Sequence, residues 1–377
     1  MRQLKWVGVA FGTALLLAAC GGGDGDQTPT VKFTSMVSFG DSLSDVGTHK
    51  VGTVAALGGG LYTVNGIAGA IGANPTPSKN WTELIAVQAG LAAPCPAQTG
   101  LDGAAAQGFS VPVVNHTGCY GYAQGGSRVT NPVGPGNKLL GGDNALLGQL
   151  TVPVVTQISN HLTASGGSFK GTELVTVMAG GNDIFLNLAT ISPTVTALVG
   201  AGMSVSDATT QASTSAVTEM GKAGAELAGY TKALIVGKGA KYVVVVNLPD
   251  ASKTPFGYSQ EAATQGLING MVTTFNTQLQ NGLVGTPGVI IVDAYSDIRN
   301  QAVNPASYAL SNVTMPACNL TAPSPNALGS SLVCNSTNVV AGDVSHYLFA
   351  DTVHPTPYGY KLLAQLVTKS LVLAGWL

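Results

Sequence analysis

The stretch that organises the chain lies near its start and reads Ser38-Phe39-Gly40-Asp41-Ser42-Leu43-Ser44-Asp45-Val46-Gly47. Residues 31–39 form a short apolar run that predicts a buried strand, and Gly40 with the polar residues after it breaks that strand sharply. The break presents the Ser42 hydroxyl where a strand emerges and a helix could begin. Backbone amides beyond such a turn, with the positive end of a helix, would stabilise an oxyanion. Alone, the stretch also fits a turn in which Ser42 or Asp41 caps a helix.

A serine hydroxyl needs a base to act as a nucleophile, and the base needs an orienting group. Both occur near the other end of the chain, in Asp351-Thr352-Val353-His354-Pro355. A carboxylate three residues before an imidazole can bond its Nδ1 and leave Nε2 free for a serine. The pattern predicts a catalytic triad of Ser42, His354 and Asp351. We interpret the remaining histidines as structural or exposed, because none has an acid at comparable spacing: His49, His116, His161 and His346.

Four blocks of the chain resemble, in order, those of the GDSL/SGNH hydrolase family, in its bacterial secreted esterase, phospholipase and acyltransferase branch. They are residues 40–45, 121–126, 180–183 and 351–355. The blocks extend over essentially the whole exported chain. The resemblance implies an α/β fold, a three-layer α/β/α sandwich around a mostly parallel sheet. It also implies a serine esterase that requires no metal or organic cofactor.

The resemblance further implies the oxyanion hole of this enzyme. Its donors would be the backbone N–H groups of Ser42 and Gly126 and the side-chain amide of Asn182. An uncharged amide donates to a negative oxygen without binding the carboxylate product too well. Family members often have Asn where this chain has Gly121, which affects local hydrogen bonding but not the Gly126 donor. We assign Asp183 a structural role as the cap of the helix that follows.

Apolar runs and helical patterns alternate along the rest of the chain, which predicts a parallel sheet with helices on both faces. Such a sheet would place Ser42 and Asn182 at the carboxyl ends of strands, where ligands bind. The predicted further strands cover residues 174–178, 242–246 and 289–292. The predicted helices cover residues 80–90, 146–162 with an interruption at Pro153, 204–234, 261–279 and the segment after Pro357. We expect a short strand at 120–124, and irregular structure elsewhere in residues 51–79, 92–142 and 300–343.

Composition argues against a nucleic-acid partner, because only 9% of the residues are charged and the formal net charge is −2. Residues 1–19 predict an export signal with a basic start and an apolar run too short for a permanent membrane helix. Residues 17–20 resemble a bacterial lipobox, so we expect Cys20 to be lipidated and residues 20–30 to form a flexible tether. A plain signal peptide cut nearby is the alternative. The expected location is the outer membrane, facing the periplasm or the surface, with the lipid as the only membrane anchor.

Four cysteines follow Cys20: Cys95, Cys119, Cys318 and Cys334. An exported compartment permits disulfides, and four cysteines allow three pairings. Pairing of sequence neighbours would close two short loops, each stabilised by about 3 kcal/mol. A metal site is the competing interpretation, but the sequence lacks a CxxC motif and a histidine at ligand spacing.

We therefore predict that residues 31–377 form a single hydrolase domain, a monomer that cleaves lipid or short-chain acyl esters. Acyl transfer to another alcohol is compatible with the same chemistry. Within enzymes, the alternatives are a carbohydrate O-acetylesterase and a polyester hydrolase. Outside enzymes, the alternative is a surface binding lipoprotein with this fold.

Overall fold

The computed structural model describes residues 31–66, 78–321, 326 and 328–377, so the predicted export signal, Cys20 and the tether lie outside the described residues. Its centre is a parallel sheet in the order β1-β4-β5-β6. The strands are β1 (Ser35–Gly40), β4 (Glu173–Met178), β5 (Tyr242–Val246) and β6 (Val289–Val292). Each of the apolar runs predicted as a sheet strand is therefore a strand. Because all four strands are parallel, their carboxyl ends meet at one edge of the sheet.

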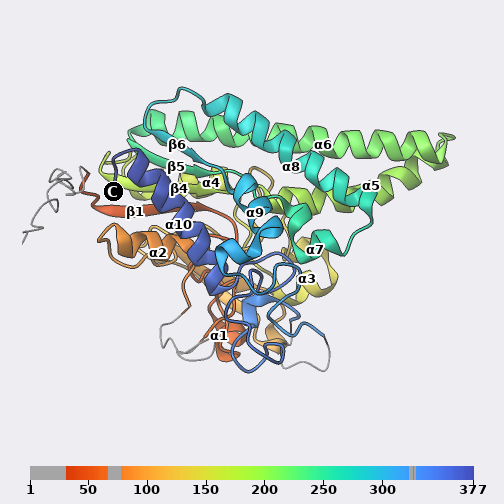
Figure 1. Cartoon of the computed structure of the whole chain (residues 1–377), viewed down its shortest axis with the longest axis horizontal. Coiled ribbons are helices and arrows are strands. Elements are labelled where there is room, and N and C mark those ends of the chain that lie inside the picture. The colour runs from red at the N-terminus through yellow and green to blue at the C-terminus, as the bar shows by residue number, and fades with distance from the viewer. Residues whose placement is uncertain (1–30, 67–77, 322–325, 327) are drawn as a thin grey trace, which may run out of the picture.

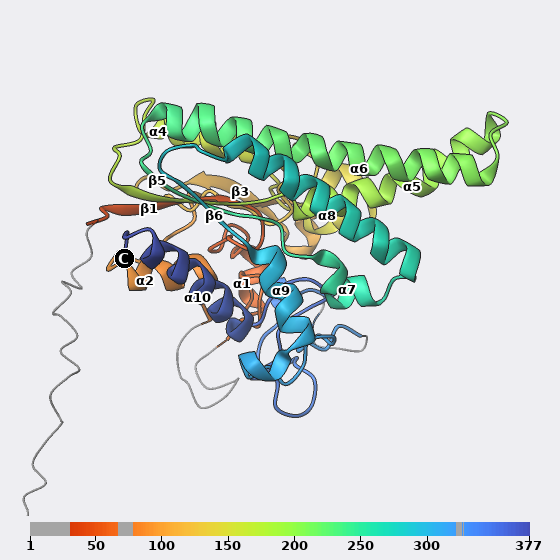
Figure 2. The same cartoon turned by 45° about the horizontal axis from the view of Figure 1, so that its top comes forward.

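Helices cover both faces of the sheet (Figures 1 and 2). Successive side chains of a strand point to opposite faces, so Val175 and Val177 join one core cluster while Leu174 and Met178 join the other. The first face is covered by α4 (Val154–Ala164), α5 (Gly181–Gly200), α6 (Val205–Tyr230) and α8 (Ala262–Leu283). The second is covered by α2 (Trp81–Gln88) and α10 (Pro357–Leu373). The predicted three-layer α/β/α sandwich is confirmed.

Helices α5 and α6 pack along each other and extend beyond the sheet (Figure 2). Helix α5 has the length and the mean hydropathy, 1.3, of a membrane span. Its first turn, however, carries the buried side chains of Asn182 and Asp183. The amino end of α5 therefore belongs to the edge of the sheet where the strands end.

Several regions predicted as irregular contain regular structure. They hold α1 (Gly52–Ala56) and the antiparallel pair β2 (Gln98–Asp102) and β3 (Ser110–Asn115). A further helix, α9 (Ala294–Val303), begins before the predicted irregular segment 300–343 and ends inside it. The strand β3 is almost wholly exposed, so it lacks the apolar alternation by which a half-buried strand is recognised. The helical segment predicted at 146–162, with its interruption at Pro153, is two helices, α3 (Gly142–Leu147) and α4. Gly148 ends α3 in a left-handed conformation, and Pro153 precedes α4.

The remaining elements are short. They are α7 (Pro255–Tyr258), the π-helical turn η3 (Thr231–Ile235), and the 3-10 turns η1 (Ala105–Gln107), η2 (Lys138–Leu140), η4 (Val236–Lys238), η5 (Ala251–Lys253), η6 (Pro305–Tyr308) and η7 (Ser331–Val333). The turns η3 and η4 continue α6, so the helix predicted at 204–234 ends close to its expected limit.

The segment 120–124 is not the regular strand that we predicted, but it runs beside β1. The Ser38 N–H donates to the Tyr120 carbonyl (3.0 Å), and the Tyr122 N–H donates to the Ser38 carbonyl (2.8 Å). The Gln124 N–H continues the pattern with Gly40 (3.2 Å). These bonds bring the following Gly125 and Gly126 to the carboxyl end of β1, next to Ser42.

Candidate active site

The turn after β1 presents Ser42 without a helix. Gly40 has φ +150°, and a Cβ there would lie 2.1 Å from the Met178 carbonyl oxygen on β4, so glycine is required. The Asp41 side chain accepts from the Leu43 N–H (3.1 Å), and the Ser44 N–H donates to the Asp41 carbonyl (3.0 Å). The expected helix start at Ser42 is therefore wrong, because this polar turn satisfies its own backbone groups.

Ser42, His354 and Asp351 are brought together by the fold, although the first two lie 312 residues apart. The Ser42 Oγ lies 2.8 Å from the His354 Nε2, and the His354 Nδ1 lies 2.8 Å from the Asp351 Oδ2. A carboxylate accepts the Nδ1 proton, so Nε2 is left as the acceptor for the serine hydroxyl. The Asp351 Oδ1 also accepts from the N–H groups of Val353 and His354, which fixes the loop around the imidazole.

The environment of Asp351 keeps its carboxyl ionised. Burial alone would raise the pKa of Asp351, but the charge of His354 and hydrogen bonds from His354 and Ser331 hold that pKa well below its usual range. The Ser331 N–H lies 3.0 Å from the Asp351 Oδ2. Sequence reasoning missed this donor, because a backbone amide in a loop has no sequence signature.

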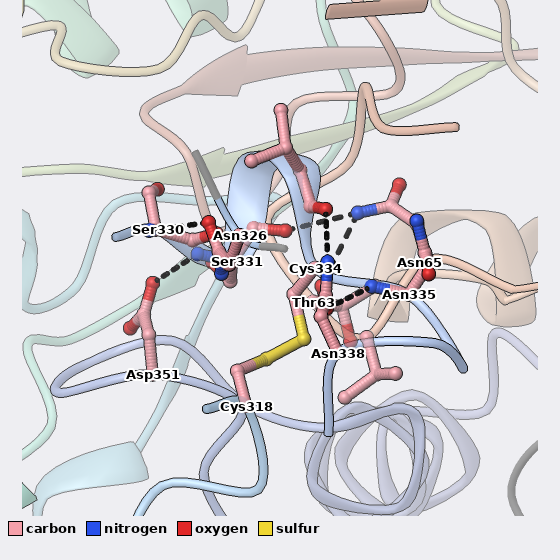
Figure 3. The surroundings of a disulfide bond; sticks show 12 residues. Thr63, Asn65, Cys318, Asn326, Ser330, Ser331, Cys334, Asn335, Asn338 and Asp351 are labelled. Atoms are coloured by element: carbon pink, nitrogen blue, oxygen red, sulfur yellow. Dashed lines mark hydrogen bonds between the residues drawn. A yellow bond between two sulfur atoms is a disulfide. The ribbon is translucent and has the colours of Figure 1, made fainter. Parts of the chain in front are cut away.

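Ser331 is held in place beside a disulfide (Figure 3). The structure contains Cys95–Cys119 and Cys318–Cys334, the pairing of sequence neighbours. The second bond closes the loop that contains Ser331, and the Cys318 N–H donates to the carbonyl of Ala350 (2.8 Å). The loop is therefore attached to Ala350, directly before Asp351, and to the Asp351 carboxylate itself.

Gly126 and Asn182 line one pocket together with Ser42 and His354. Gly126 has φ +80°, and a Cβ there would lie 2.1 Å from the Pro135 carbonyl oxygen, so only glycine fits this turn. The Asn182 Nδ2 donates to the carbonyl of Ser127 (2.8 Å). That bond orients the amide, and because an amide nitrogen carries two hydrogens, one remains for a ligand oxygen.

The buried carboxylates of Asp45 and Asp183 hold the turn at Gly125–Gly126, and the residues that follow it, in place. The Asp45 Oδ2 accepts from the Gly125 N–H (2.9 Å). Asp183 accepts from the Arg128 Nε (2.8 Å) and from the Val129 N–H (3.1 Å). Asp183 is therefore structural, as predicted, but it joins α5 to the 126–129 segment and does not cap the helix, whose N-cap is Gly180.

Asp41 is a second buried carboxyl beside Ser42. Burial raises the pKa of Asp41 to about 7, opposed by the Leu43 N–H and by the charge of His354. A hydrogen bond from the Gly181 N–H, at the amino end of α5, also favours its ionised form. The hydrogen bond to Leu43 makes Asp41 part of the turn that presents Ser42.

Two pockets meet at Ser42, and both are also lined by Pro135, Asn182 and His354. One has a volume of about 480 Å³ and extends past Gly126, and the other has a volume of about 330 Å³ and extends past Leu43. A molecule bound at Ser42 can therefore extend in two directions. Among the described residues, no three or more His, Cys, Asp or Glu side chains gather as a metal ligand set.

Three solved structures are similar to this chain at low identity. A member of the lipolytic G-D-S-L family from Veillonella parvula is 14% identical with a TM-score of 0.36, and covers 90% of this chain and 98% of its own. LAE5, an alpha/beta hydrolase from the metagenome of Lake Arreo, Spain, is 12% identical with a TM-score of 0.39, covering 91% and 95%. An extracellular lipase from Streptomyces rimosus is 15% identical with a TM-score of 0.39, covering 89% and 99%.

Comparison with curated proteins gives no match. The family model of the GDSL-like lipases/acylhydrolases, in contrast, matches residues 36–367. That range contains the turn at Ser42, the glycine turn at Gly126, the amino end of α5 and the loop with Asp351 and His354. The chain therefore belongs to the GDSL-like lipase/acylhydrolase family, and it is a hydrolase that acts on ester bonds.

Proposed function

We propose that this hydrolase is a serine esterase in which Ser42 is the nucleophile, His354 the general base and Asp351 the group that orients His354. The observation that carries the proposal is the continuous chain of 2.8 Å contacts from the Ser42 Oγ through His354 to Asp351. This is the arrangement that activates a serine hydroxyl.

The reaction has two halves. The Ser42 Oγ attacks the ester carbonyl while the His354 Nε2 takes its proton, and His354 then gives that proton to the departing alcohol oxygen. Water, activated by the same imidazole, cleaves the acyl-enzyme and releases the carboxylic acid. The Asp351 carboxylate stabilises the imidazolium in both halves.

The negative oxygen formed in each half needs hydrogen-bond donors. We assign these to the N–H groups of Ser42 and Gly126 and to the Asn182 amide. Two observations support the assignment: Gly126 and Asn182 share a pocket with Ser42, and the Asn182 amide is oriented by Ser127.

Replacement of Ser42 by alanine tests the function. We expect Ser42→Ala to abolish turnover of p-nitrophenyl butyrate while the unfolding transition stays unchanged. The matched control is Ser44→Ala, because the Ser44 hydroxyl accepts from the Trp81 indole and does not contact His354. Full turnover in Ser42→Ala would refute the esterase mechanism and favour a binding protein.

We also propose that residues 31–377 act as one domain and a monomer, exported and anchored by a lipid on Cys20. The two disulfides support export, because such bonds persist in oxidising compartments. Intact-mass measurement of the protein from membranes tests the anchor. A mass that corresponds to cleavage without lipid would contradict it.

A further inference from the structure

The two pockets that meet at Ser42 differ in chemistry. The smaller is bordered mainly by apolar side chains, among them Leu43, Ile184, Phe185, Leu248 and Phe256. The larger contains the side chains of Tyr62, Asp143, Asn144, Gln149 and Ser330 beside those of Leu146, Leu147 and Leu328. It is the more polar of the two, and we call it the polar pocket. An ester has two arms, the acyl chain and the alcohol, and the two pockets offer each arm a different environment.

Phe185 and Phe256 form an aromatic wall of the apolar pocket. Their rings contact each other edge to face, with centroids 5.2 Å apart. Phe185 lies in α5, three residues after Asn182 in the sequence. The Phe256 N–H donates to the carbonyl of Thr352 (2.9 Å), a residue of the loop that carries Asp351 and His354. The wall is therefore held by α5 near Asn182 and by the loop that carries Asp351 and His354. It limits the length of an apolar chain that fits in this pocket.

Hydrogen bonds fix the side chains of the polar pocket in advance. The Leu150 N–H donates to the His49 Nε2, so the His49 Nδ1 carries the proton and donates to the Tyr62 hydroxyl (3.0 Å). The Tyr62 hydroxyl in turn donates to the Gln149 Oε1 (2.9 Å). Burial lowers the pKa of His49, which keeps this relay neutral. The Gln149 side-chain amide retains its nitrogen donors for a ligand.

No Lys or Arg lines either pocket among the described residues, and Asp143 is the exposed charge on the wall of the polar one. A phosphate on the alcohol would meet a carboxylate there and no cation. Hydroxyl groups, in contrast, find amide and hydroxyl partners on that wall. The same hydroxyls would lose their hydrogen bonds in the apolar pocket, which is costly.

We propose that the substrate is an ester of an uncharged polyhydroxy alcohol with an apolar acyl chain of limited length. The acyl chain lies in the apolar pocket against Phe185 and Phe256, and the alcohol lies against Tyr62 and Gln149. Phe256 sets the acyl-length limit, and Asp143 disfavours anionic alcohols. The inference rests on the proposed function of Ser42 and names the substrate class of that site.

The first experiment measures kcat/KM on glycerol monoesters of increasing acyl length, below the concentration at which each ester aggregates. For the wild-type protein, kcat/KM should rise roughly fourfold per added methylene, the rate equivalent of burying that group, and then fall when the chain meets the Phe185–Phe256 wall. In Phe256→Ala the optimum should move to longer chains. Phe256→Leu, which keeps an apolar side chain in case alanine unfolds α7, should move it less.

The second experiment compares one acyl chain of optimal length on glycerol and on glycerol phosphate. The wild-type protein should prefer the uncharged ester several-fold, and Asp143→Lys, a change at an exposed position, should narrow or reverse that preference. Phe256→Ala should leave the ratio unchanged, and Asp143→Lys should leave the optimal acyl length unchanged. Each variant is therefore the control for the other.

Two outcomes overturn the inference while the esterase function stands. One is Ser42-dependent hydrolysis with the same acyl-length profile in the wild-type protein and both Phe256 variants. The other is a wild-type preference for the phosphorylated ester. Hydrolysis that persists in Ser42→Ala would instead overturn the proposed function itself.

Discussion

Breaking the Cys318–Cys334 disulfide should lower kcat, whereas breaking Cys95–Cys119 should not, although the two bonds stabilise the fold by similar amounts. Their sequence separations are 16 and 24 residues. Loop entropy assigns each a contribution of about 3 kcal/mol, so replacing either pair by serines should lower the free energy of unfolding by roughly that amount.

The difference arises from what each loop holds. The loop closed by Cys318–Cys334 contains Ser331, whose N–H donates to Asp351 at 3.0 Å. A hydrogen bond to a charged group contributes about 1.5 to 3 kcal/mol. Since 1.36 kcal/mol is a tenfold change in rate, complete loss of this bond sets an upper limit of roughly a hundredfold on the fall in kcat. The pKa of Asp351 should also rise toward its ordinary value.

The assay compares Cys318→Ser/Cys334→Ser with Cys95→Ser/Cys119→Ser. Urea unfolding gives the stability of each double variant, and kcat for p-nitrophenyl butyrate is measured where both are fully folded. We expect similar losses of stability and a fall in kcat only in the first. An equal fall in both variants, or an unchanged kcat in the first, would refute the link between this loop and Asp351.

Two further predictions concern single side chains. Asn182→Ala should lower kcat by roughly 10²- to 10³-fold with little change in KM, as expected for loss of an oxyanion donor; an effect on KM alone would mean that Asn182 binds the ground state. His161 is buried and has no hydrogen-bond partner for either ring nitrogen among the residues that the structure describes, and burial lowers its pKa from 6.5 to about 4. Its neutral form is favoured in the folded state, so the free energy of unfolding should fall as the pH falls from 6.5 toward 4. His161→Phe should reduce that fall. An unchanged slope of unfolding free energy against pH in this variant would contradict the reasoning.

The strands could be predicted from sequence because a parallel sheet is buried on both faces. Residues such as those of β5, four of them consecutive valines, read as unbroken apolar runs. Elements without that burial were missed. The strand β3 is exposed at most of its positions, and α9, with buried Ala294 and Gln301, carries no apolar stripe.

The residues of the candidate site that act through their side chains could be predicted from the sequence. Ser42, His354 and Asp351 stand out by residue type and spacing, and the structure places them in hydrogen-bond contact. The supporting contacts were not predictable. The Ser331 donor is a backbone amide, and the bond from Gly125 to Asp45 joins residues 80 positions apart. Such contacts depend on how loops meet in space, which spacing along the chain does not reveal.

Covalent labelling by a fluorophosphonate probe, located by mass spectrometry, tests the central claim most directly, because the probe reacts with an activated serine hydroxyl. We predict one adduct, on Ser42, and its loss in His354→Ala. An adduct on a different serine, or labelling of Ser42 at the wild-type rate in His354→Ala, would contradict the claim that His354 activates Ser42.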